Sequence, residues 1–542
     1  MQFDYVIVGA GSAGCVLAAR LSENPGANVL LLEAGGLGGG LWESLPLGVG
    51  KILNVDERVW RDRTEPSEGT RKRSVEWVSG RGLGGSSAIN GMLFVRGHPA
   101  MYDRMARAGC SGWDFARCLT YFRKLEDCSF SDSPNRATGG PIGVTMVDPD
   151  SISEAFLEAC SAFGIPRIRD YNDDLPDGAS YLQLSVRRGL RSGAAAGYLR
   201  PIRPRENLTV TTGAKVERVL FSGRTATGVI YSDANGQHQA RALREVIVCA
   251  GAVRTPALLE RSGIGRKELL EVLGIPVVAD RPEVGENLSD HFMPRVCFET
   301  REKSTVNHML NSRLSQLREA AKFVAFRKGL FACPTLKATA YVRSDPDLEL
   351  PDLRLQIGLM SAPSRIPSVD KNRSGTPAAK AGLDPQSSFH IGVYDIYPEA
   401  RGSTHIRTAA SDQPSVVQPN YLGTASDRRK IAAGLRLVRD LSLSTPLRDV
   451  VVDEIRPRLD HPTEDDLANY AATSGETCWH PVGTCRMGED ADAVVDPSCR
   501  VRQVENLRVV DASVFPFLTS SNTNVPVLML AERIADVMRH ET

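Results

Sequence analysis

A run of glycines near the start of the chain has the spacing of a phosphate-binding loop. The residues are GAGSAG at positions 9–14. Gly9 permits a tight turn, Gly11 lets the backbone approach a pyrophosphate, and Gly14 allows a helix to pack closely against a strand. The N-terminus of that helix would present free N–H groups and a partial positive charge to the phosphates. The spacing therefore predicts a dinucleotide site, and an ordinary glycine turn is the alternative.

Glu33 has the position of the acid in a dinucleotide-binding motif. Glu33 ends a second apolar segment, NVLLLE at 28–33, about 20 residues beyond the glycines. In that position an acid accepts hydrogen bonds from the ribose of adenosine, and it disfavours a 2′-phosphate. FAD or NAD is therefore predicted in preference to NADP.

A second glycine-rich stretch, SGRGLGGSSAINGM at 79–92, holds more glycines and small hydroxyl residues than an ordinary helix or strand. Consecutive glycines permit unusual backbone angles, and N–H groups exposed in this way can surround an anion. Taken alone, the stretch fits an anion-binding loop and a plain flexible loop equally well.

Two polar residues near the C-terminus have side chains suited to acid–base chemistry. A neutral imidazole at His480, with an ordinary pKa of roughly 6.5, can remove a hydroxyl proton near neutral pH. The amide of Asn522 can donate a hydrogen bond to a substrate oxygen and stabilise developing negative charge. Residue type alone also fits structural roles, since His480 is one of nine histidines and Asn522 would suit a turn in SSNTN.

Strand and helix patterns surround these motifs in an order that favours a parallel sheet. Residues 3–8 and 28–33 are short apolar runs typical of buried strands, and residues 15–22 between them have helical character. Strand, glycine turn, helix and strand within about 30 residues form a βαβ unit. Further strands are predicted at 207–220, 226–232 and 244–251, and helices at 253–262, 265–273 and 525–539.

Composition indicates a folded protein of more than one domain. The chain has 542 residues, of which 42% are hydrophobic and 24% charged. Lys plus Arg and Asp plus Glu each number 65, so the formal net charge is zero. That balance removes the main electrostatic reason to expect nucleic-acid binding.

Cysteine usage and hydropathy bear on the compartment. Eleven cysteines stand singly without a CxxC pair, which favours reduced thiols over disulfides or a metal site. The N-terminal segment has no basic leader, and no apolar run approaches the roughly 20 residues of a membrane span. We expect a cytoplasmic protein without a metal, and peripheral contact with the inner membrane stays open.

Four separated motifs together resemble the glucose–methanol–choline (GMC) oxidoreductase family, in its bacterial alcohol and choline dehydrogenase-like branch. RGLGGSSAIN at 81–90 and GAVRTPALLERSGIG at 251–265 resemble its two signatures. HPVGTCRMG at 480–488 and the segment 509–538 resemble its catalytic C-terminal region. The resemblance covers nearly the whole chain, with the motifs in the family's order.

The resemblance implies an α/β fold, α+β overall, with two interleaved domains. A Rossmann-like FAD-binding domain is expected at 1–150, 205–300 and 470–542. A substrate-binding domain, built on an antiparallel sheet with helices, is expected at 151–204 and 301–469.

The resemblance also implies FAD as cofactor and names its site. Val216 would meet the adenine, and Asn524 the pyrimidine edge of the flavin. Because Ile89 replaces the histidine through which some relatives attach FAD, a non-covalent flavin is expected. The expected cofactor-binding residues are Gly9, Gly11, Ser12, Ala13, Gly14, Glu33, Ala34, Gly84, Ser86, Asn90, Gly91, Val216, Asp511, Ala512 and Asn524.

The implied reaction is oxidation of a primary alcohol to an aldehyde. His480 matches the family's catalytic base, and Asn522 matches the second catalytic position, where relatives carry His or Asn. Removing the hydroxyl proton raises electron density on the carbinol carbon and promotes hydride transfer to flavin N5. NLSDH at 287–291 also recurs in relatives and receives only a structural role around the cofactor site.

Several alternatives remain. The electron acceptor is oxygen, a quinone or another carrier, and RGH at 96–98 with the HPVGTCRMG ending favours a dehydrogenase over an oxidase. A non-redox enzyme of the hydroxynitrile lyase type shares the family fold. A light-driven fatty-acid decarboxylase is disfavoured by the His–Asn pair, and a pure binding scaffold has no use for it. The particular alcohol and the oligomeric state stay open.

Two features of the expected substrate domain are ambiguous. The segment 361–388, rich in Pro, Gly and Ser, predicts a long loop that is either a lid or a disordered insertion. Lys337 stands where many relatives carry a glutamate. If it faces the substrate, it would repel a cation such as choline and favour neutral or anionic alcohols, aromatic or heteroaromatic ones among them; the alternative is that it points to solvent.

Overall fold

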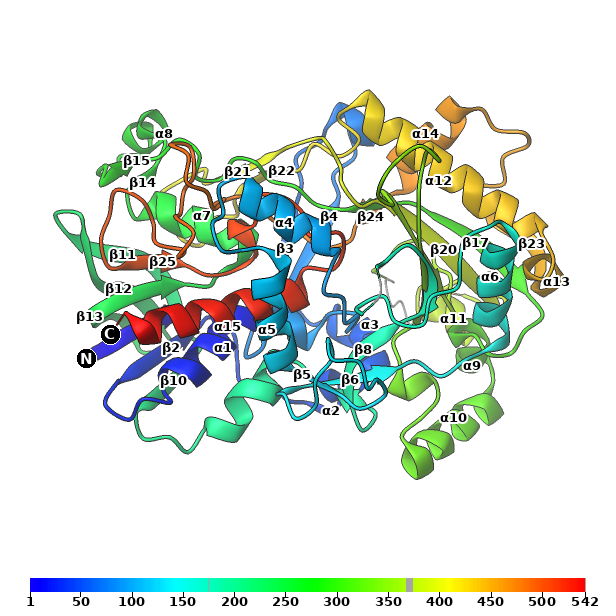
Figure 1. Cartoon of the computed structure of the whole chain (residues 1–542), viewed down its shortest axis with the longest axis horizontal. Helices are drawn as coiled ribbons and strands as arrows, with labels where there is room; N and C mark the ends of the chain where they lie inside the picture. The colour runs from blue at the N-terminus through cyan, green and yellow to red at the C-terminus, as the bar shows by residue number, and fades with distance from the viewer. Residues whose placement is uncertain (174, 367–373, 542) are drawn as a thin grey trace.

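Two β-sheets, each with its own helices, divide the molecule (Figure 1). The computed structural model describes residues 1–173, 175–366 and 374–541. Both chain termini lie beside the first sheet, and the second sheet lies at the opposite end of the molecule. This arrangement confirms the α/β fold class that the sequence predicts.

The first sheet has seven strands, and its parallel part contains the predicted βαβ unit. Its order is β10-β2-β1-β13-β12-β11, with β25 paired to β13. The first half of β13 pairs antiparallel with β12, and its second half pairs parallel with β1. The strands are β1 Gln2–Val8, β2 Val29–Glu33, β10 Leu208–Thr212, β11 Lys215–Ser222, β12 Thr225–Asp233, β13 Gly236–Val248 and β25 Leu507–Val509.

Two helices from opposite ends of the chain pack together beside this sheet. These are α1, Ser12–Leu21, and α15, Asn524–His540, drawn in blue and red in Figure 1. Nearly every residue of α1 is buried, as an apolar helix enclosed on all sides requires. The buried carboxylate of Glu532 pairs with Arg20 at 2.7 Å and joins the two helices. Both helices begin slightly earlier than the sequence predicts.

The second sheet is antiparallel and has six strands in the order β23-β17-β20-β19-β18-β7. The helix α12, Ala425–Leu443, packs on one face, where Gly434 allows the close approach of Val393 and Leu353. The strands are β7 Gly178–Tyr181, β17 Arg295–Thr300, β18 Leu336–Val342, β19 Leu353–Gly358, β20 Ser388–Asp395 and β23 Val451–Arg456.

Side chains along β19 alternate between the two faces of this sheet. Leu353 and Leu355 face α12, while Arg354 and Gln356 point to the opposite face. That opposite face therefore carries polar groups, although every residue of β19 is buried.

The strand β17 differs from the expected domain ranges. Residues 295–300 were predicted to belong to the cofactor domain, yet they pair with β20 and β23 in the second sheet. The apolar pattern of β17 suits either sheet, so the sequence cannot place it. The other domain boundaries remain predictions.

The described part of the segment 361–388 is mostly irregular, as predicted, but it contains one short helix. A short helix, α11, occupies Pro377–Lys380, and its Ala378 is fully buried. Ser361 bonds to Ser388 at 2.8 Å and to Asp384, so the two ends of the segment are tied together. Residues 367–373, which the prediction includes, lie outside the described residues.

The remaining elements connect or cover the two sheets. A small sheet contains β5 Glu126–Cys128, β6 Ile142–Met146, β8 Gln183–Arg187 and β9 Leu190–Arg191, and a hairpin contains β3 Val59–Arg63 and β4 Glu76–Gly80. Helices include α2 Leu41–Ser44, α4 Pro99–Arg107, α5 Phe115–Leu125, α6 Ser151–Ala162, α7 Gly251–Arg261, α8 Lys267–Val272, α9 Val306–Asn311, α10 Arg313–Phe326 and α14 Glu464–Ser474.

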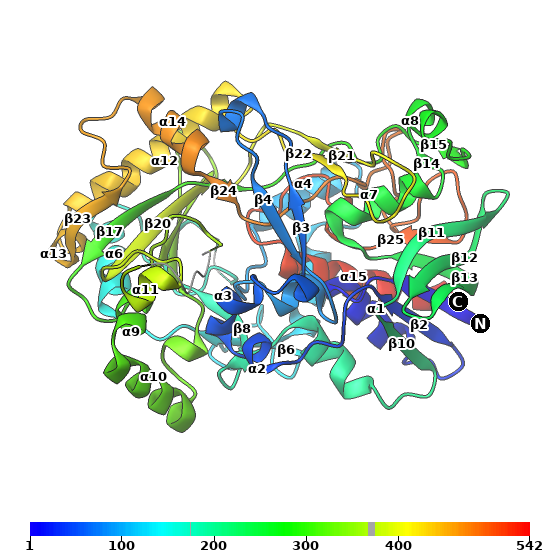
Figure 2. The same cartoon turned by 180° about the vertical axis from the view of Figure 1, so that it is seen from behind.

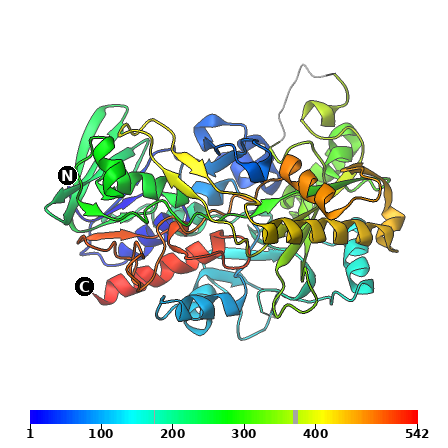
Figure 3. The same ribbon diagram turned by 90° about the horizontal axis from the view of Figure 1, so that it is seen from above.

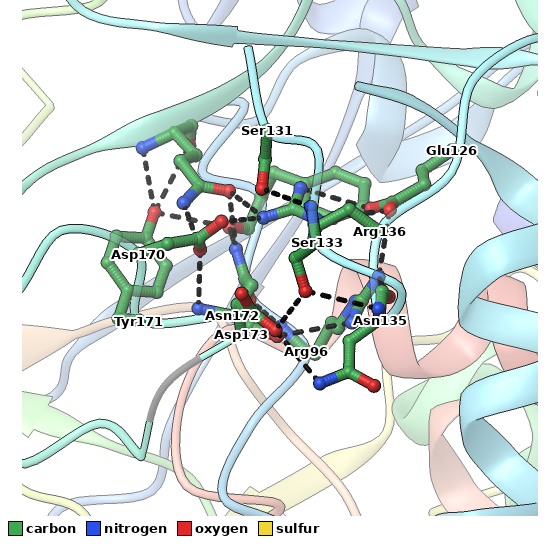
Figure 4. A network of polar contacts seen from close by, with 12 residues as sticks. Arg96, Glu126, Ser131, Ser133, Asn135, Arg136, Asp170, Tyr171, Asn172 and Asp173 are labelled. Carbon is green, nitrogen blue, oxygen red and sulfur yellow. Dashed lines mark hydrogen bonds and ion pairs between the residues drawn. The ribbon is translucent and has the colours of Figure 1, made fainter. Parts of the chain in front are cut away.

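A buried network of charges fastens the segments between the sheets (Figure 4). Glu126 accepts from Arg96 at 2.8 Å and from Arg136 at 3.1 Å. Arg136 also donates to Asp170, whose second oxygen accepts from Gln183. Two arginines thus meet two carboxylates, and a third acid of the network, Asp173, accepts from Ser133 and Asn135. Breaking one partner would leave an uncompensated buried charge, which typically destabilises a protein by about 3–5 kcal/mol.

Two further expectations can be compared with the structure. Each of the eleven cysteines is buried and free of a disulfide bond. Among the described residues, no helix has the length and apolar character needed to cross a bilayer.

Candidate active site

A single cavity of about 1100 Å³ extends from the glycine loops to the polar face of the second sheet. Val216 and Ala34 line one end, and Leu336, Gln356 and His390 line the other. The cavity therefore spans both sheets, which is the place where two domains can bring a cofactor and a substrate together.

Thirteen of the fifteen predicted cofactor residues line this cavity, as do both predicted catalytic residues. The lining set comprises Gly9, Gly11, Ser12, Ala13, Glu33, Ala34, Ser86, Asn90, Gly91, Val216, Asp511, Ala512 and Asn524, with His480 and Asn522. Gly14 and Gly84 are not part of the lining. A Cβ at Gly14 would lie 1.9 Å from the carbonyl oxygen of Gly9, so Gly14 allows close packing rather than ligand contact.

Glu33 joins the two glycine-rich loops. Its Oε2 accepts from the N–H of Ala10 at 2.9 Å, and its Oε1 accepts from Gly35 at 2.8 Å and Gly82 at 2.9 Å. Burial raises the pKa of this carboxyl, and the three backbone bonds oppose that rise. A carboxylate has about four acceptor positions, so one remains for a ribose hydroxyl.

The space around the glycines indicates where a ligand could approach the backbone. A Cβ at Gly11 would have the carbonyl oxygen of Cys249 as its nearest neighbour, at 3.9 Å. Protein packing alone therefore does not require glycine there, whereas close approach of a pyrophosphate does. At Gly9 the φ angle of 99° requires glycine for the turn itself. The two loops meet tightly, since a Cβ at Gly85 would lie 2.8 Å from the Cα of Gly11. The residues present fit a dinucleotide.

His480 and Asn522 face one another, as the sequence predicts for a catalytic pair. The Nδ2 of Asn522 lies 2.8 Å from the Nε2 of His480. The Oδ1 of Asn522 accepts from the guanidinium of Arg354 at 2.8 Å and from Ser521 at 3.0 Å. These two donors fix the amide so that its N–H group points at His480.

A hydrogen-bond chain determines which nitrogen of His480 carries the proton. The Nε2 of His291 lies 2.9 Å from the carbonyl oxygen of Ile396, which can only accept, so this nitrogen must carry a proton. Burial lowers the pKa of His291 to about 3, so its ring is neutral and its Nδ1 is an acceptor. The Nδ1 of His480, 2.9 Å away, must then donate. Nε2 of His480 is therefore unprotonated, and it accepts from the N–H of Asn522.

The backbone of His480 is held by Asp290. The Oδ1 of Asp290 accepts from the N–H of His480 at 2.7 Å, and its Oδ2 accepts from the hydroxyls of Thr477, at 2.6 Å, and Tyr421. Burial raises the pKa of Asp290 to about 6. The NLSDH segment therefore positions the predicted base through Asp290 and His291. The structural role predicted for NLSDH thus includes contacts with the predicted base.

The environment keeps His480 neutral. Burial is the largest cause that lowers its pKa well below 6.5, and the positive charges of Arg365 and Arg354 act in the same direction, as does His291. A neutral imidazole is the form that can accept a proton at neutral pH.

Arg354 is a buried cation that the sequence reasoning missed. It is fully buried, and its hydrogen bonds go to Asn522, Tyr394, Thr339 and Ser521 rather than to a carboxylate. Among the described residues no ion pair neutralises it. The alternation in LRLQI could have placed it on the face opposite the leucines, although its contact with Asn522 depends on the fold.

The substrate end of the cavity carries positive charge. Arg295 and Arg365 line it, and the Arg365 guanidinium lies 4.5 Å from the centre of the Trp479 ring. That guanidinium donates to the carbonyl oxygen of Thr477, and no ion pair joins it to a carboxylate in the described parts of the chain. Gln356 has a buried Nε2 without a hydrogen-bond partner in the structure.

Lys337 takes neither of the positions considered from sequence. It is 5% exposed, does not line the cavity, and donates to the carbonyl oxygen of Asp148 at 3.2 Å. Because its neighbour Leu336 lines the cavity, the alternation of β18 turns Lys337 to the other face. Lys337 therefore cannot select substrates by direct contact.

Comparisons with known proteins agree on one family. Profiles of the GMC oxidoreductases match residues 3–293 and 398–531. The mitochondrial choline dehydrogenase of Homo sapiens is 36% identical, covering 99% of this chain and 90% of its own. An alcohol dehydrogenase (acceptor) of Pseudomonas putida is 33% identical, covering 99% and 96%. The crystal structure of pyridoxine 4-oxidase from Mesorbium loti matches with a TM-score of 0.87 and 30% identity over 99% of both chains.

Proposed function

The chain belongs to the GMC oxidoreductases, FAD-dependent enzymes that act on CH–OH donors, and from this premise we propose that it oxidises a primary alcohol to an aldehyde, with His480 as the base. The observation that carries the proposal is the hydrogen bond from the N–H of Asn522 to the unprotonated Nε2 of His480, 2.8 Å apart inside the cavity.

A substrate hydroxyl that replaced this direct bond would donate to His480 and accept from Asn522. His480 then takes the proton, while the Asn522 amide and the charge of Arg354 behind it stabilise the oxygen that becomes negative. The proton received at Nε2 leaves His480 as a cation, which keeps its Nδ1–H bond to the neutral His291. Bound FAD supplies the acceptor for the hydride that leaves the carbinol carbon.

The flavin would be held without a covalent bond. Ile89 lines the cavity and is buried among apolar side chains, and its hydrocarbon side chain offers no atom for a bond to the cofactor. Gly11, Glu33 and Val216 would hold the ADP part, and Asn524 with Asp511 would lie near the ring system. Ser12 donates to the Oδ1 of Asn524 at 2.7 Å, which orients that amide toward the cavity.

The alcohol would be neutral or anionic. Four acids line the described part of the cavity, Glu33, Asp62, Asp412 and Asp511, and none stands on the second sheet. Arg295 and Arg365 do lie at that end. Arg295 pairs with Glu476 at 3.4 Å, whereas no ion pair joins Arg365 to a carboxylate among the described residues, so a quaternary ammonium group there would meet the positive charge of Arg365. This chain would therefore differ in substrate from the relatives named choline dehydrogenase.

One anaerobic experiment tests the proposal. Purified yellow protein is mixed without oxygen with benzyl alcohol, 4-(hydroxymethyl)benzoate or choline, and the visible absorbance of the flavin is followed. At least one primary alcohol should bleach the flavin. Retention of full colour with a broad panel of primary alcohols would refute the proposal and favour a non-redox enzyme of the lyase type. Repeating turnover with oxygen, a quinone and an artificial acceptor distinguishes a dehydrogenase, the form favoured by the motifs, from an oxidase.

A further inference from the structure

One helix stands out because the structure buries none of its residues. α10, Arg313–Phe326, projects from the edge of the molecule below the second sheet in Figures 1 and 2. Four of its large apolar side chains are exposed to solvent: Leu314 by 78%, Leu317 by 69%, Val324 by 75% and Phe326 by 72%. Scattered exposed leucines are ordinary on a protein surface, but Leu314, Leu317 and Val324 share one face of the helix, and such a patch calls for a partner.

The exposed apolar residues lie on the side of α10 that faces away from the protein. With 3.6 residues per turn, Leu314, Leu317 and Val324 fall within an arc of about 100°, together with two alanines. The opposite side faces the body, because Glu319 accepts from the N–H of Leu330 at 2.8 Å and Phe323 contacts the ring of Phe331. The apolar stripe therefore lies on the solvent side of α10, and the other side of the helix contacts the protein.

Basic side chains border this face on both sides. Arg318 and Lys322 follow one edge of the apolar stripe, and Arg313 lies along the other. Glu319 is the single acid of the helix, and it points inward. The whole chain has zero net charge, so the positive charge of α10 is specific to this helix.

A second exposed apolar segment lies along the same edge. α2 follows the lower border of the molecule with α10 in both Figures 1 and 2, and its Leu41 and Trp42 are 67% and 42% exposed. The 3-10 turn after α2, Pro46–Gly48, contacts the turn Leu330–Ala332 that follows α10. Figure 3 shows the molecule from above, with both chain termini at one end.

The two segments also border the cavity. Trp42 and Lys51 belong to its wall on one side, and Leu310 and Gln316, at the junction of α9 and α10, belong to its wall on the other. A surface that covered α2 and α10 would therefore lie against the substrate end of the enzyme.

We propose that α10 and α2 together bind the surface of an anionic lipid bilayer. Leu314, Leu317 and Val324 would enter the boundary between head groups and acyl chains, and the flanking Arg and Lys side chains would pair with lipid phosphates. A tryptophan such as Trp42 suits the same interface. Charge selects this partner, since an apolar stripe between two basic rows complements a negative membrane better than a second copy of the same basic helix. The proposal does not depend on the reaction assigned to the cavity.

Vesicle binding tests it directly. The holoenzyme is centrifuged with vesicles of phosphatidylcholine containing phosphatidylglycerol, and in parallel with vesicles of phosphatidylcholine alone. We expect binding to the anionic vesicles that weakens with salt. Arg318→Ala with Lys322→Ala should weaken it by roughly thirtyfold, the usual effect of removing two basic residues near an anionic surface. Leu317→Glu should abolish it, whereas Leu443→Glu, at a 72% exposed position outside α10, is the matched control and should bind normally.

A label reports whether the helix enters the lipid. All eleven native cysteines are buried, so Leu317→Cys offers an accessible thiol for a polarity-sensitive dye, with Val272→Cys as the control. A blue shift on adding anionic vesicles, confined to the Leu317→Cys protein, is expected.

Absence of vesicle binding in the parent, or equal binding by Leu317→Glu, would overturn the proposal. A dimer that Leu317→Glu converts to a monomer, without any lipid binding, would assign the face to a second copy instead. Anaerobic flavin bleaching by a water-soluble alcohol, measured on the same variants, keeps failure of this proposal separate from failure of the proposed reaction.

Discussion

The Nδ1 atoms of His291 and His480 lie 2.9 Å apart, and two nitrogens at that distance need one proton between them. Because the other nitrogen of His291 is committed to the carbonyl oxygen of Ile396, the shared proton belongs to His480. The base thereby exposes an unprotonated Nε2 to the cavity. A single backbone carbonyl, two side chains away, sets the protonation pattern of the site.

Replacing His291 tests this chain of bonds. His291→Leu leaves the Nδ1–H of His480 without an acceptor and frees the ring to change tautomer, so the rate constant of flavin reduction by alcohol should fall by about tenfold or more. His291→Gln can accept from His480 and donate to Ile396, and it should retain most of the rate. Anaerobic stopped-flow absorbance measures both. Equal losses in the two variants would show that His291 only fills space.

Removing the base itself should have a larger effect. His480→Ala is expected to slow flavin reduction by roughly a hundredfold or more, the usual scale for a positioned base. The FAD content should stay at the parental level, because the pyrophosphate contacts lie elsewhere in the cavity. A parental reduction rate in this variant would refute the assignment.

Asn522→Ala separates orientation from proton removal. Its loss removes the donor that faces His480 Nε2 and the amide that Arg354 holds in place, so reduction should slow while FAD remains bound. Unchanged turnover would reduce Asn522 to a turn residue. The matched variant Ser521→Ala removes a neighbouring contact to the same amide and should have a much smaller effect.

The sequence predicts the cofactor half of the site better than the catalytic half. GAGSAG followed by an acid depends on local backbone geometry, so Gly9, Gly11 and Glu33 could be placed before the fold was known. Gly14 shows the limit of the motif, because it packs against Gly9 instead of meeting a ligand.

What the sequence could not supply are contacts between elements far apart in the chain. Asp290 and His291 meet His480 across about 190 residues, and Arg354 reaches Asn522 from the second sheet. Lys337 is the opposite case. The resemblance placed it at a substrate-facing position, but the register of β18 turns its side chain away from the cavity, toward the carbonyl oxygen of Asp148. One step of register reverses the face of every side chain in a strand.

The acid limit of the reaction should reflect the buried base. Since the pKa of His480 lies well below 6.5, mainly through burial, the base stays unprotonated as the pH falls through 6.5, and the rate of flavin reduction should decline only at lower pH. Arg365→Gln removes one of the positive charges that lower this pKa, so the acid limb should move to higher pH. Stopped-flow measurements over about pH 5 to 8 would compare the acid limb of the parent with that of Arg365→Gln. An acid limb at or above 6.5 in the parent would contradict the buried, neutral base.

Cofactor retention gives a test that needs no turnover. Acid or heat should release the flavin from the polypeptide, because Ile89 cannot bond to it. Glu33→Ala should lower FAD occupancy after dialysis, since the variant loses the three backbone hydrogen bonds that hold the glycine loops together and the remaining acceptor for a ribose. Flavin that stays with the denatured chain on a gel, or full occupancy in Glu33→Ala, would count against the respective assignment.

The last prediction concerns the charge of the substrate. With Arg295 and Arg365 at the substrate end of the cavity, 4-(hydroxymethyl)benzoate or benzyl alcohol should exceed choline in kcat/KM. Two unit charges ~7 Å apart at an effective dielectric near 20 interact by ~2 kcal/mol, which is roughly a factor of thirty. Arg365→Gln should therefore lower the ratio of benzoate to benzyl alcohol efficiency, whereas Arg365→Lys keeps the charge and should preserve the ratio. Because Arg365 also bonds to the carbonyl oxygen of Thr477, a loss of local structure would lower both efficiencies together and leave their ratio unchanged. Choline as the best of the three substrates would contradict the electrostatic argument outright.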